Sequence, residues 1–121
     1  MATPRTPTAQ VIPLQPGAVA DAPARTHALL KTASLELVHL VLPAGAGLPE
    51  HAAPGEITLH GLQGCLVLQL RDRTLRLAPG DLVHLSAAEP HAVHALADSR
   101  ALLTLCLHRP ADPHHTTGSA R

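Results

Sequence analysis

Short apolar segments separated by turn residues run through most of this 121-residue chain and restrict its fold more than any other feature. They lie at roughly residues 28–32, 34–42, 56–62, 65–70, 73–77, 81–86, 91–96 and 101–108. Within one of them Ile57, Leu59 and Gly61 alternate with Thr58 and His60, which is the period of a half-buried strand. No segment between the prolines keeps apolar residues three and four apart for ten residues, as a helix requires. The pattern predicts an all-β fold of eight or nine strands.

Turn residues mark where these strands meet. Arg71-Asp72-Arg73 is a polar break that most simply closes a hairpin. Ala78-Pro79-Gly80-Asp81 predicts a type II turn, because proline sets φ at the second position and glycine accepts a positive φ at the third. An antiparallel sheet of this length hides its edges by closing on itself or by pairing with a second subunit.

The length gives material for one domain with two tails. Residues 1–25 hold five of the twelve prolines and are interpreted as an extended arm. In this arm Val11, Ile12 and Leu14 can form a short edge strand, since Pro13 cannot donate to a sheet interior. Residues 26–108 are expected to form the barrel, and residues 109–121 a disordered tail.

Composition excludes several classes of function. The chain has no Phe, Trp or Tyr, so its core must be aliphatic and it offers no rings on which bases stack. Nine basic residues balance nine acidic ones, which argues against nucleic-acid or membrane-surface binding. No apolar run approaches a membrane span or a secretory signal, so we expect a cytoplasmic protein. Cys65 and Cys106 each lie in an apolar run and are expected to be reduced core thiols.

A glycine and a histidine stand eleven residues apart in the stretch Gly80–His91, which contains the predicted strand at 81–86 and ends where the next one begins. Upstream, a lone histidine, His51, precedes Glu56 and a strand that ends near Gly64. These stretches resemble the two sequence motifs of the cupin family, and the resemblance covers residues 45–107, about half of the chain.

The second of these motifs keeps its spacing here, although three of its residues differ. Gly80 and His91 match the family pattern, whereas Ser86, Ala88 and Ala95 replace its proline, glycine and asparagine. This motif therefore points to His91 as the residue that carries the family's histidine function.

The first motif usually has two histidines one residue apart, then a glutamate, and a glycine after the strand. Here it has one histidine: His51 is either the first, with Ala53 in place of the second, or the second, with Pro49 in place of the first. Counting back from the glycine that ends the strand puts Ile57 at the acid position, and a bulge restores Glu56 there.

The resemblance implies a single cupin-type β-barrel, a jelly roll of about eight to nine strands with an extended N-terminal arm. It also implies that His51 and His91, forty residues apart, converge inside it to bind a ligand and one divalent metal ion, Fe, Mn, Zn or Ni. Glu56 is the third candidate, because a metal that does chemistry needs about three protein ligands. His60 is a weaker candidate, since about 13 Å of strand separates it from Glu56. His94 should point to the opposite face from His91.

Three functions stay open at this point, and no catalytic residue is identified. The first is a small cupin that binds a small-molecule ligand, with or without a divalent metal. The second is a metal-dependent dioxygenase or isomerase in which His51 and His91 anchor the ion. The third is a ligand-sensing module that acts through a partner. We also expect a homodimer, because a barrel of about 80 residues buries little area by itself.

Overall fold

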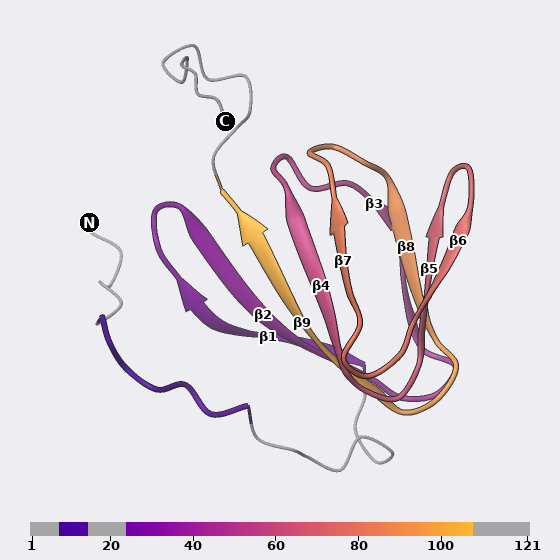
Figure 1. Ribbon diagram of the computed structural model, residues 1–121, viewed down its shortest axis with the longest axis horizontal. Helices are drawn as coiled ribbons and strands as arrows, with labels where there is room; N and C mark the ends of the chain where they lie inside the picture. The colour runs from indigo at the N-terminus through magenta and orange to yellow at the C-terminus, as the bar shows by residue number, and fades with distance from the viewer. Residues whose placement is uncertain (1–7, 15–23, 108–121) are drawn as a thin grey trace.

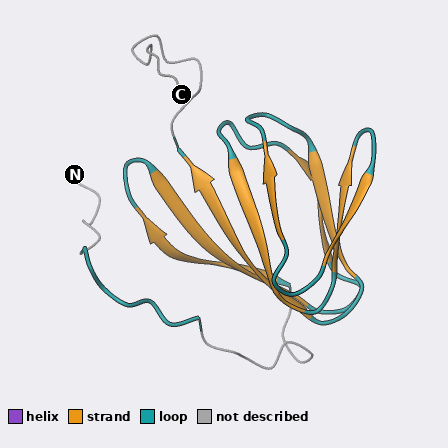
Figure 2. Cartoon of the chain, in the orientation of Figure 1, coloured by secondary structure: helices purple, strands orange, loops and turns teal. Residues whose placement is uncertain are grey.

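The computed structural model describes residues 8–14 and 24–107, and this part of the chain contains strands and loops but no helix (Figure 2). Its strands are β1 (Arg25–Lys31), β2 (Leu35–Leu42), β3 (Gly47–His51), β4 (Ile57–Gln63), β5 (Leu66–Leu70), β6 (Thr74–Leu77), β7 (Leu82–Leu85), β8 (His91–Ala95) and β9 (Ser99–Cys106). Within these described ranges no helix is long and apolar enough to cross a membrane. The predicted all-β fold class is confirmed.

The strands form two antiparallel sheets that face each other (Figure 1). The larger sheet has the order β1-β2-β9-β4-β7, and the smaller one has the order β3-β8-β5-β6. The two sheets share no ladder in the described residues, so the jelly roll is not the closed barrel that the sequence suggested. Loops link the layers instead, as where the Ala88 amide donates to the Ala53 carbonyl.

The core between the sheets is aliphatic, as the composition requires. Strand β4 shows how it is built, because Ile57, Leu59 and Gly61 are buried while Thr58 and His60 on the other face are only half-buried. The inward side chains of both sheets make one cluster: Val38, Leu40, Leu42, Ile57, Leu59, Leu66, Leu68, Leu70, Leu77, Leu85, Val93, Ala95 and Ala101. The alternation thus gives the larger sheet an inner face toward this core and an outer face away from it.

Both predicted turns are present. The Leu70 amide donates to the Arg73 carbonyl and closes the β5–β6 hairpin. The Asp81 amide donates to the Ala78 carbonyl, and Gly80 has a φ of 91°, as a type II turn requires at that position. The Asp81 carboxylate also accepts from the Ala78 amide at 2.8 Å, which holds the turn closed.

Two differences from the sequence prediction concern strands. Strand β3 was not predicted, because Gly47–His51 contains Pro49 and has no apolar alternation. It is an edge strand, and its register with β8 shifts between Leu48 and His51, which accommodates the missing amide hydrogen of proline. The edge strand predicted at Val11–Leu14 is not present in residues 8–14. The remainder of the arm and the predicted tail at 109–121 lie outside the described residues.

Candidate functional site

His51 and His91 lie side by side at the edge of the smaller sheet. They are direct partners across the antiparallel pair β3 and β8, and their ring centroids are 4.4 Å apart with the planes tilted by 57°. Directly paired side chains stand on the same face of a sheet, which is why residues far apart in sequence meet here. The structure thus brings together the two histidines singled out by the sequence.

Both rings are oriented in the same way by the backbone two residues before them. Nδ1 of His51 donates to the Pro49 carbonyl at 2.9 Å, and Nδ1 of His91 donates to the Glu89 carbonyl at 2.9 Å. A carbonyl oxygen only accepts hydrogen bonds, so Nδ1 must carry the hydrogen in each ring. The lone pair of a neutral ring is then on Nε2. Neither Nε2 atom has a hydrogen-bond partner among the described residues.

The pair stands at the mouth of an apolar cavity between the sheets. His91 is buried, with 4% of its surface exposed, whereas His51 is exposed. The other lining residues are all aliphatic: Leu40, Leu48, Ile57, Leu59, Leu68, Leu85, Val93 and Leu103. The aliphatic side chains fill most of the cavity, which leaves room for about one water molecule. The cavity behind the two histidines is therefore too small for anything much larger than water.

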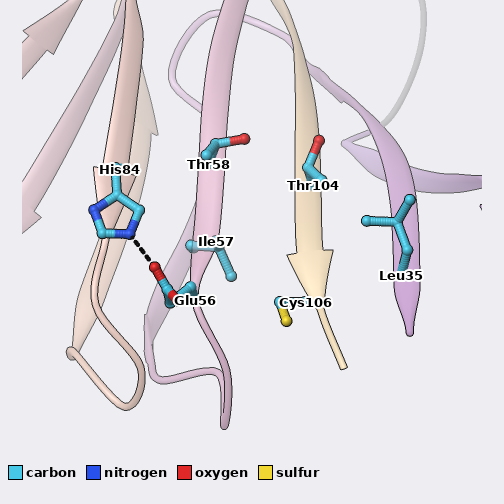
Figure 3. A pocket seen from close by; sticks show the side chains of 7 residues that line it. All are labelled: Leu35, Glu56, Ile57, Thr58, His84, Thr104 and Cys106. Atoms are coloured by element: carbon cyan, nitrogen blue, oxygen red, sulfur yellow. Dashed lines mark hydrogen bonds and ion pairs between the residues drawn. The ribbon is translucent and has the colours of Figure 1, made fainter. Parts of the chain in front are cut away.

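The structure does not bring Glu56 to this pair. Ile57, the next residue, lines the cavity. Residues 57–60 keep a regular register with β7 and β9, and the register of β4 with β9 shifts only further along the strand, between Gly61 and Gln63, so Glu56 is not turned inward. Figure 3 shows the Glu56 carboxylate joined instead to His84 of β7, where His84 Nε2 donates to Oε1 at 2.7 Å. The two side chains lie over an open hollow that Thr58 and Thr104 also line. The irregularity of β4 thus does not bring Glu56 to the histidine pair, contrary to the expectation that a bulged strand would do so.

His60 and His94 also lie away from the pair. His60 is directly opposite Leu82 and Leu102 on the outer face of the larger sheet. His94 is exposed on the face of β8 opposite to His91, as the strand period predicted. In the described ranges no group of three His, Cys, Asp or Glu side chains could hold a metal ion. The weaker candidate His60 therefore does not complete the site. The Nε2 atoms of His51 and His91 remain as the two nitrogens that can coordinate a metal ion.

The sequence analysis missed what orients these rings and where the mouth lies. Main-chain carbonyls of Pro49 and Glu89 hold the rings, and each stands two residues before its histidine. The motif spacing carries no sign of such contacts, since any residue type supplies a carbonyl. One visible sign was available: a proline two residues before His51 and one residue before His91 restricts the backbone there.

Comparisons with known proteins agree with this architecture. The family model described as "Cupin domain" matches residues 38–108. Among solved structures, a cupin superfamily protein from Desulfitobacterium hafniense DCB-2 has a TM-score of 0.72 and 18% identity, covering 89% of this chain and 100% of that one. An RmlC-like cupin family protein with a double-stranded β-helix fold from Methanocaldococcus jannaschii has a TM-score of 0.71 and 17% identity, covering 84% and 93% of the two chains.

A third similar structure belongs to an enzyme. It is a DMSP lyase from Ruegeria pomeroyi DSS-3, with a TM-score of 0.65 and 24% identity, and the match covers 74% of this chain but 49% of that one. At these identities the structural likeness shows the fold alone. No curated protein sequence gives a significant match.

Proposed function

The chain belongs to the cupin domain family, and from this premise we propose that it is a small-molecule-binding cupin in which His51 and His91 hold one divalent metal ion at the mouth of the jelly roll. The ion and the exposed His51 together present a compact ligand with a polar anchor above the apolar cavity. The observation that carries this proposal is the cross-strand histidine pair, with both Nε2 atoms free.

The donor set fits an ion held by two protein ligands. A metal-bound histidine usually donates its second ring nitrogen to a carbonyl or carboxylate, which fixes the tautomer and raises the basicity of the ligating nitrogen. Both rings have this bond already. Imidazole ligands suit Zn, Fe and Ni, and water and the ligand's own oxygens would fill the other positions. When bound, the ion would act as a Lewis acid toward a ligand oxygen.

The enzyme alternatives are less well supported. A dioxygenase or isomerase would call for about three protein ligands around its metal, and the described residues supply two. Glu56, the candidate for the third, is bonded to His84 on the outer face. No observation specifically favours the ligand-sensing module, and the cytoplasmic location stays a prediction that cell fractionation tests.

Metal uptake tests the proposal directly. Protein purified without a histidine tag should bind about one Zn²⁺, Fe²⁺, Mn²⁺ or Ni²⁺ ion per chain by elemental analysis and calorimetric titration. His51→Ala and His91→Ala should each weaken binding about 10- to 100-fold, and the double variant should abolish it.

His94→Ala is the matched control, because His94 lies on the same strand as His91 but is exposed on its opposite face. This variant should bind the metal as the wild type does. The proposal fails if the wild type takes up no ion, or if the double variant binds as tightly as the wild type.

We also propose that the protein is a homodimer. The described body is small, and a domain of about 80 residues gains little from its own core. Apolar side chains remain exposed, among them Leu82 on the edge strand β7, at 65%, and Val11 in the arm, at 94%. A second copy could cover both. Light scattering at micromolar concentration should give twice the chain mass, and a monomer there contradicts the proposal.

A further inference from the structure

Arg100 is a buried cation that has no carboxylate partner within residues 8–14 and 24–107. Only 8% of its surface is exposed, and in the described residues the ion pairs involve Arg71, Arg73 and His84 instead. Taking a charge out of water is costly unless an opposite charge or strong hydrogen bonds compensate for it. The surroundings of Arg100 therefore need an explanation that the family's histidine site does not give.

The present partners of Arg100 are neutral, and two of them are distant. Nε donates to Nε2 of His39 at 3.1 Å, while Nη1 reaches the Gln63 side-chain oxygen at 3.5 Å and Nη2 reaches the Leu14 carbonyl at 3.4 Å. A guanidinium bonded to an oxyanion would have distances of about 2.7–2.9 Å. The two outer nitrogens of the guanidinium are thus held only by long hydrogen bonds, to the arm and to β4.

The sheet register gathers other nitrogen-bearing side chains on the same outer face. One row across the strands reads Arg25, Val41, Arg100 and Gln63, because each residue pairs directly with the next. The adjacent row reads His27, His39, Leu102 and His60. These two rows contain two arginines, three histidines and an amide, but no acidic residue. In a chain with nine basic and nine acidic residues this is a segregated donor patch.

Several carboxylates of the described region have partners elsewhere. Glu56 bonds His84 at the other end of the same face, Asp98 accepts from the Ala44 amide, and Glu50 pairs with Arg71. Arg25 and His27 are exposed, so they can reach a ligand that arrives from solvent. Arg25 and Arg100 lie two strands apart, about 10 Å between backbones, with the buried Val41 between them, and long arginine side chains from both can reach one small anion.

We propose that this patch, formed by Arg25, His27 and Arg100, binds a compact oxyanion of the phosphate class, free or as the phosphate group of a small molecule. The anion takes the place of the Leu14 carbonyl at Nη2 of Arg100. Guanidinium groups bind such oxyanions through paired hydrogen bonds, and donors from two strands match the several acceptor oxygens of a phosphate better than the two of a carboxylate. The patch is on the outer face, separate from the His51–His91 pair.

Inorganic phosphate, titrated calorimetrically at constant ionic strength with chloride as the reference anion, tests the proposal. Phosphate should bind the wild type and raise its Tm, because a ligand that binds only the folded state stabilises it. Arg25→Gln, an exposed change that leaves the core intact, should weaken binding about tenfold, and Arg100→Gln should abolish it. Arg76→Gln, on the exposed face of β6 in the other sheet, should bind phosphate as the wild type does.

Two further variants make the result specific. The His51→Ala, His91→Ala double variant should keep phosphate binding. The phosphate proposal can therefore stand if the metal proposal fails, and the metal proposal can stand if the phosphate proposal fails. Asp21→Asn removes the one acidic residue that precedes β1 in the sequence. Phosphate binding by this variant but not by the wild type would show an internal counterion and overturn the proposal. Absence of binding to the wild type, or equal loss in Arg76→Gln, would overturn it as well.

Discussion

Two pairs of basic side chains contain histidines whose Nε2 atoms differ in their bonding. One pair, His51 and His91, is between the sheets, and the other, His39 and Arg100, is on the outer face of the larger sheet. His51 and His91 stand between the sheets, and each ring donates to a carbonyl two residues before it, so both Nε2 lone pairs are free. His39 is on the outer face of the larger sheet, and its Nε2 lone pair accepts from Arg100. The His51–His91 pair is therefore free to bind a metal ion, whereas Nε2 of His39 already accepts a hydrogen bond from Arg100.

The comparison shows that the partner of a histidine decides whether it is available. Burial alone does not decide it, since His91 and His39 are both buried, with 4% and 8% of their surfaces exposed. Burial of the ring lowers the pKa of His39, and the positive charge of the nearby Arg100 lowers it further, because both disfavour the charged form of the ring. His39 is thus a neutral ring that accepts a hydrogen bond from Arg100. His91, at the mouth of the cavity, has an Nε2 lone pair that is free to bind a metal ion.

The largest effect is expected from weakening the inner face on which the histidine pair rests. Leu40 is 2% exposed and lines the cavity. Leu40→Ala should lower the free energy of unfolding by about 2–5 kcal/mol, because it removes buried methyl groups and leaves a void. Leu96→Ala, at an exposed position in the bend between β8 and β9 and outside the core between the sheets, should change it by less than about 0.5 kcal/mol. Denaturant unfolding measures both, and equal losses would contradict the assignment of the faces.

Removing the occupied histidine should come next in size. His39→Ala takes away the acceptor for Nε of Arg100 and leaves a buried donor unpaired. We expect a loss of about 1–3 kcal/mol in the free energy of unfolding, the usual cost of such a group. The double variant His39→Ala, Arg100→Met provides the check. It should lose less than the sum of the two single losses, and strict additivity would mean that the bond contributes nothing.

The pH dependence of the free energy of unfolding should give a further test of the buried, hydrogen-bonded His39. The pKa of His39 in the folded state lies below its usual 6.5. Above 6.5 both states are neutral at His39 and it contributes no pH dependence. As the pH falls through 6.5 the unfolded chain takes up a proton first, so stability is lost until the pH passes the folded-state value. His39→Gln should show a smaller loss than the wild type in urea unfolding over this range, and an identical loss would be inconsistent with the lowered pKa.

The smallest effect is expected at the exposed member of the inner pair. His51→Ala removes a ring whose one protein hydrogen bond goes to a carbonyl of its own strand. The free energy of unfolding of the metal-free protein should therefore change by less than about 0.5 kcal/mol. Thermal unfolding checks this. A loss as large as that of His39→Ala would mean that His51 has a structural role, and the comparison would break.

Most of the fold could be predicted from the sequence, and the exceptions have physical reasons. The alternation in β4 and the turn at Ala78–Asp81 are local, so they could be seen without coordinates. Strand β3 could not, because Gly47–His51 has neither alternation nor β-branched residues and is a strand through its pairing with β8. An isolated stretch of sequence carries no record of its pairing partner.

The candidate site, too, could be predicted from the sequence only in part. The two motifs pointed to His51 and His91, and the pairing of β3 with β8 places them side by side. Glu56 was misplaced because β4 begins in regular register at Ile57, and its register with β9 shifts only between Gly61 and Gln63, which leaves Glu56 away from the pair. The Arg100–His39 bond was not predicted at all, since sixty-one residues separate its members and neither belongs to a motif.

The sequence by itself determined the all-β class, the aliphatic core and the positions of the turns, because these follow from neighbouring side chains and from backbone preferences. Tertiary structure alone decided which histidine lone pairs are free, which face Glu56 occupies and that the basic side chains gather around Arg100. Those outcomes depend on strand register, and register is set when strands from distant parts of the chain pair and bury one face together.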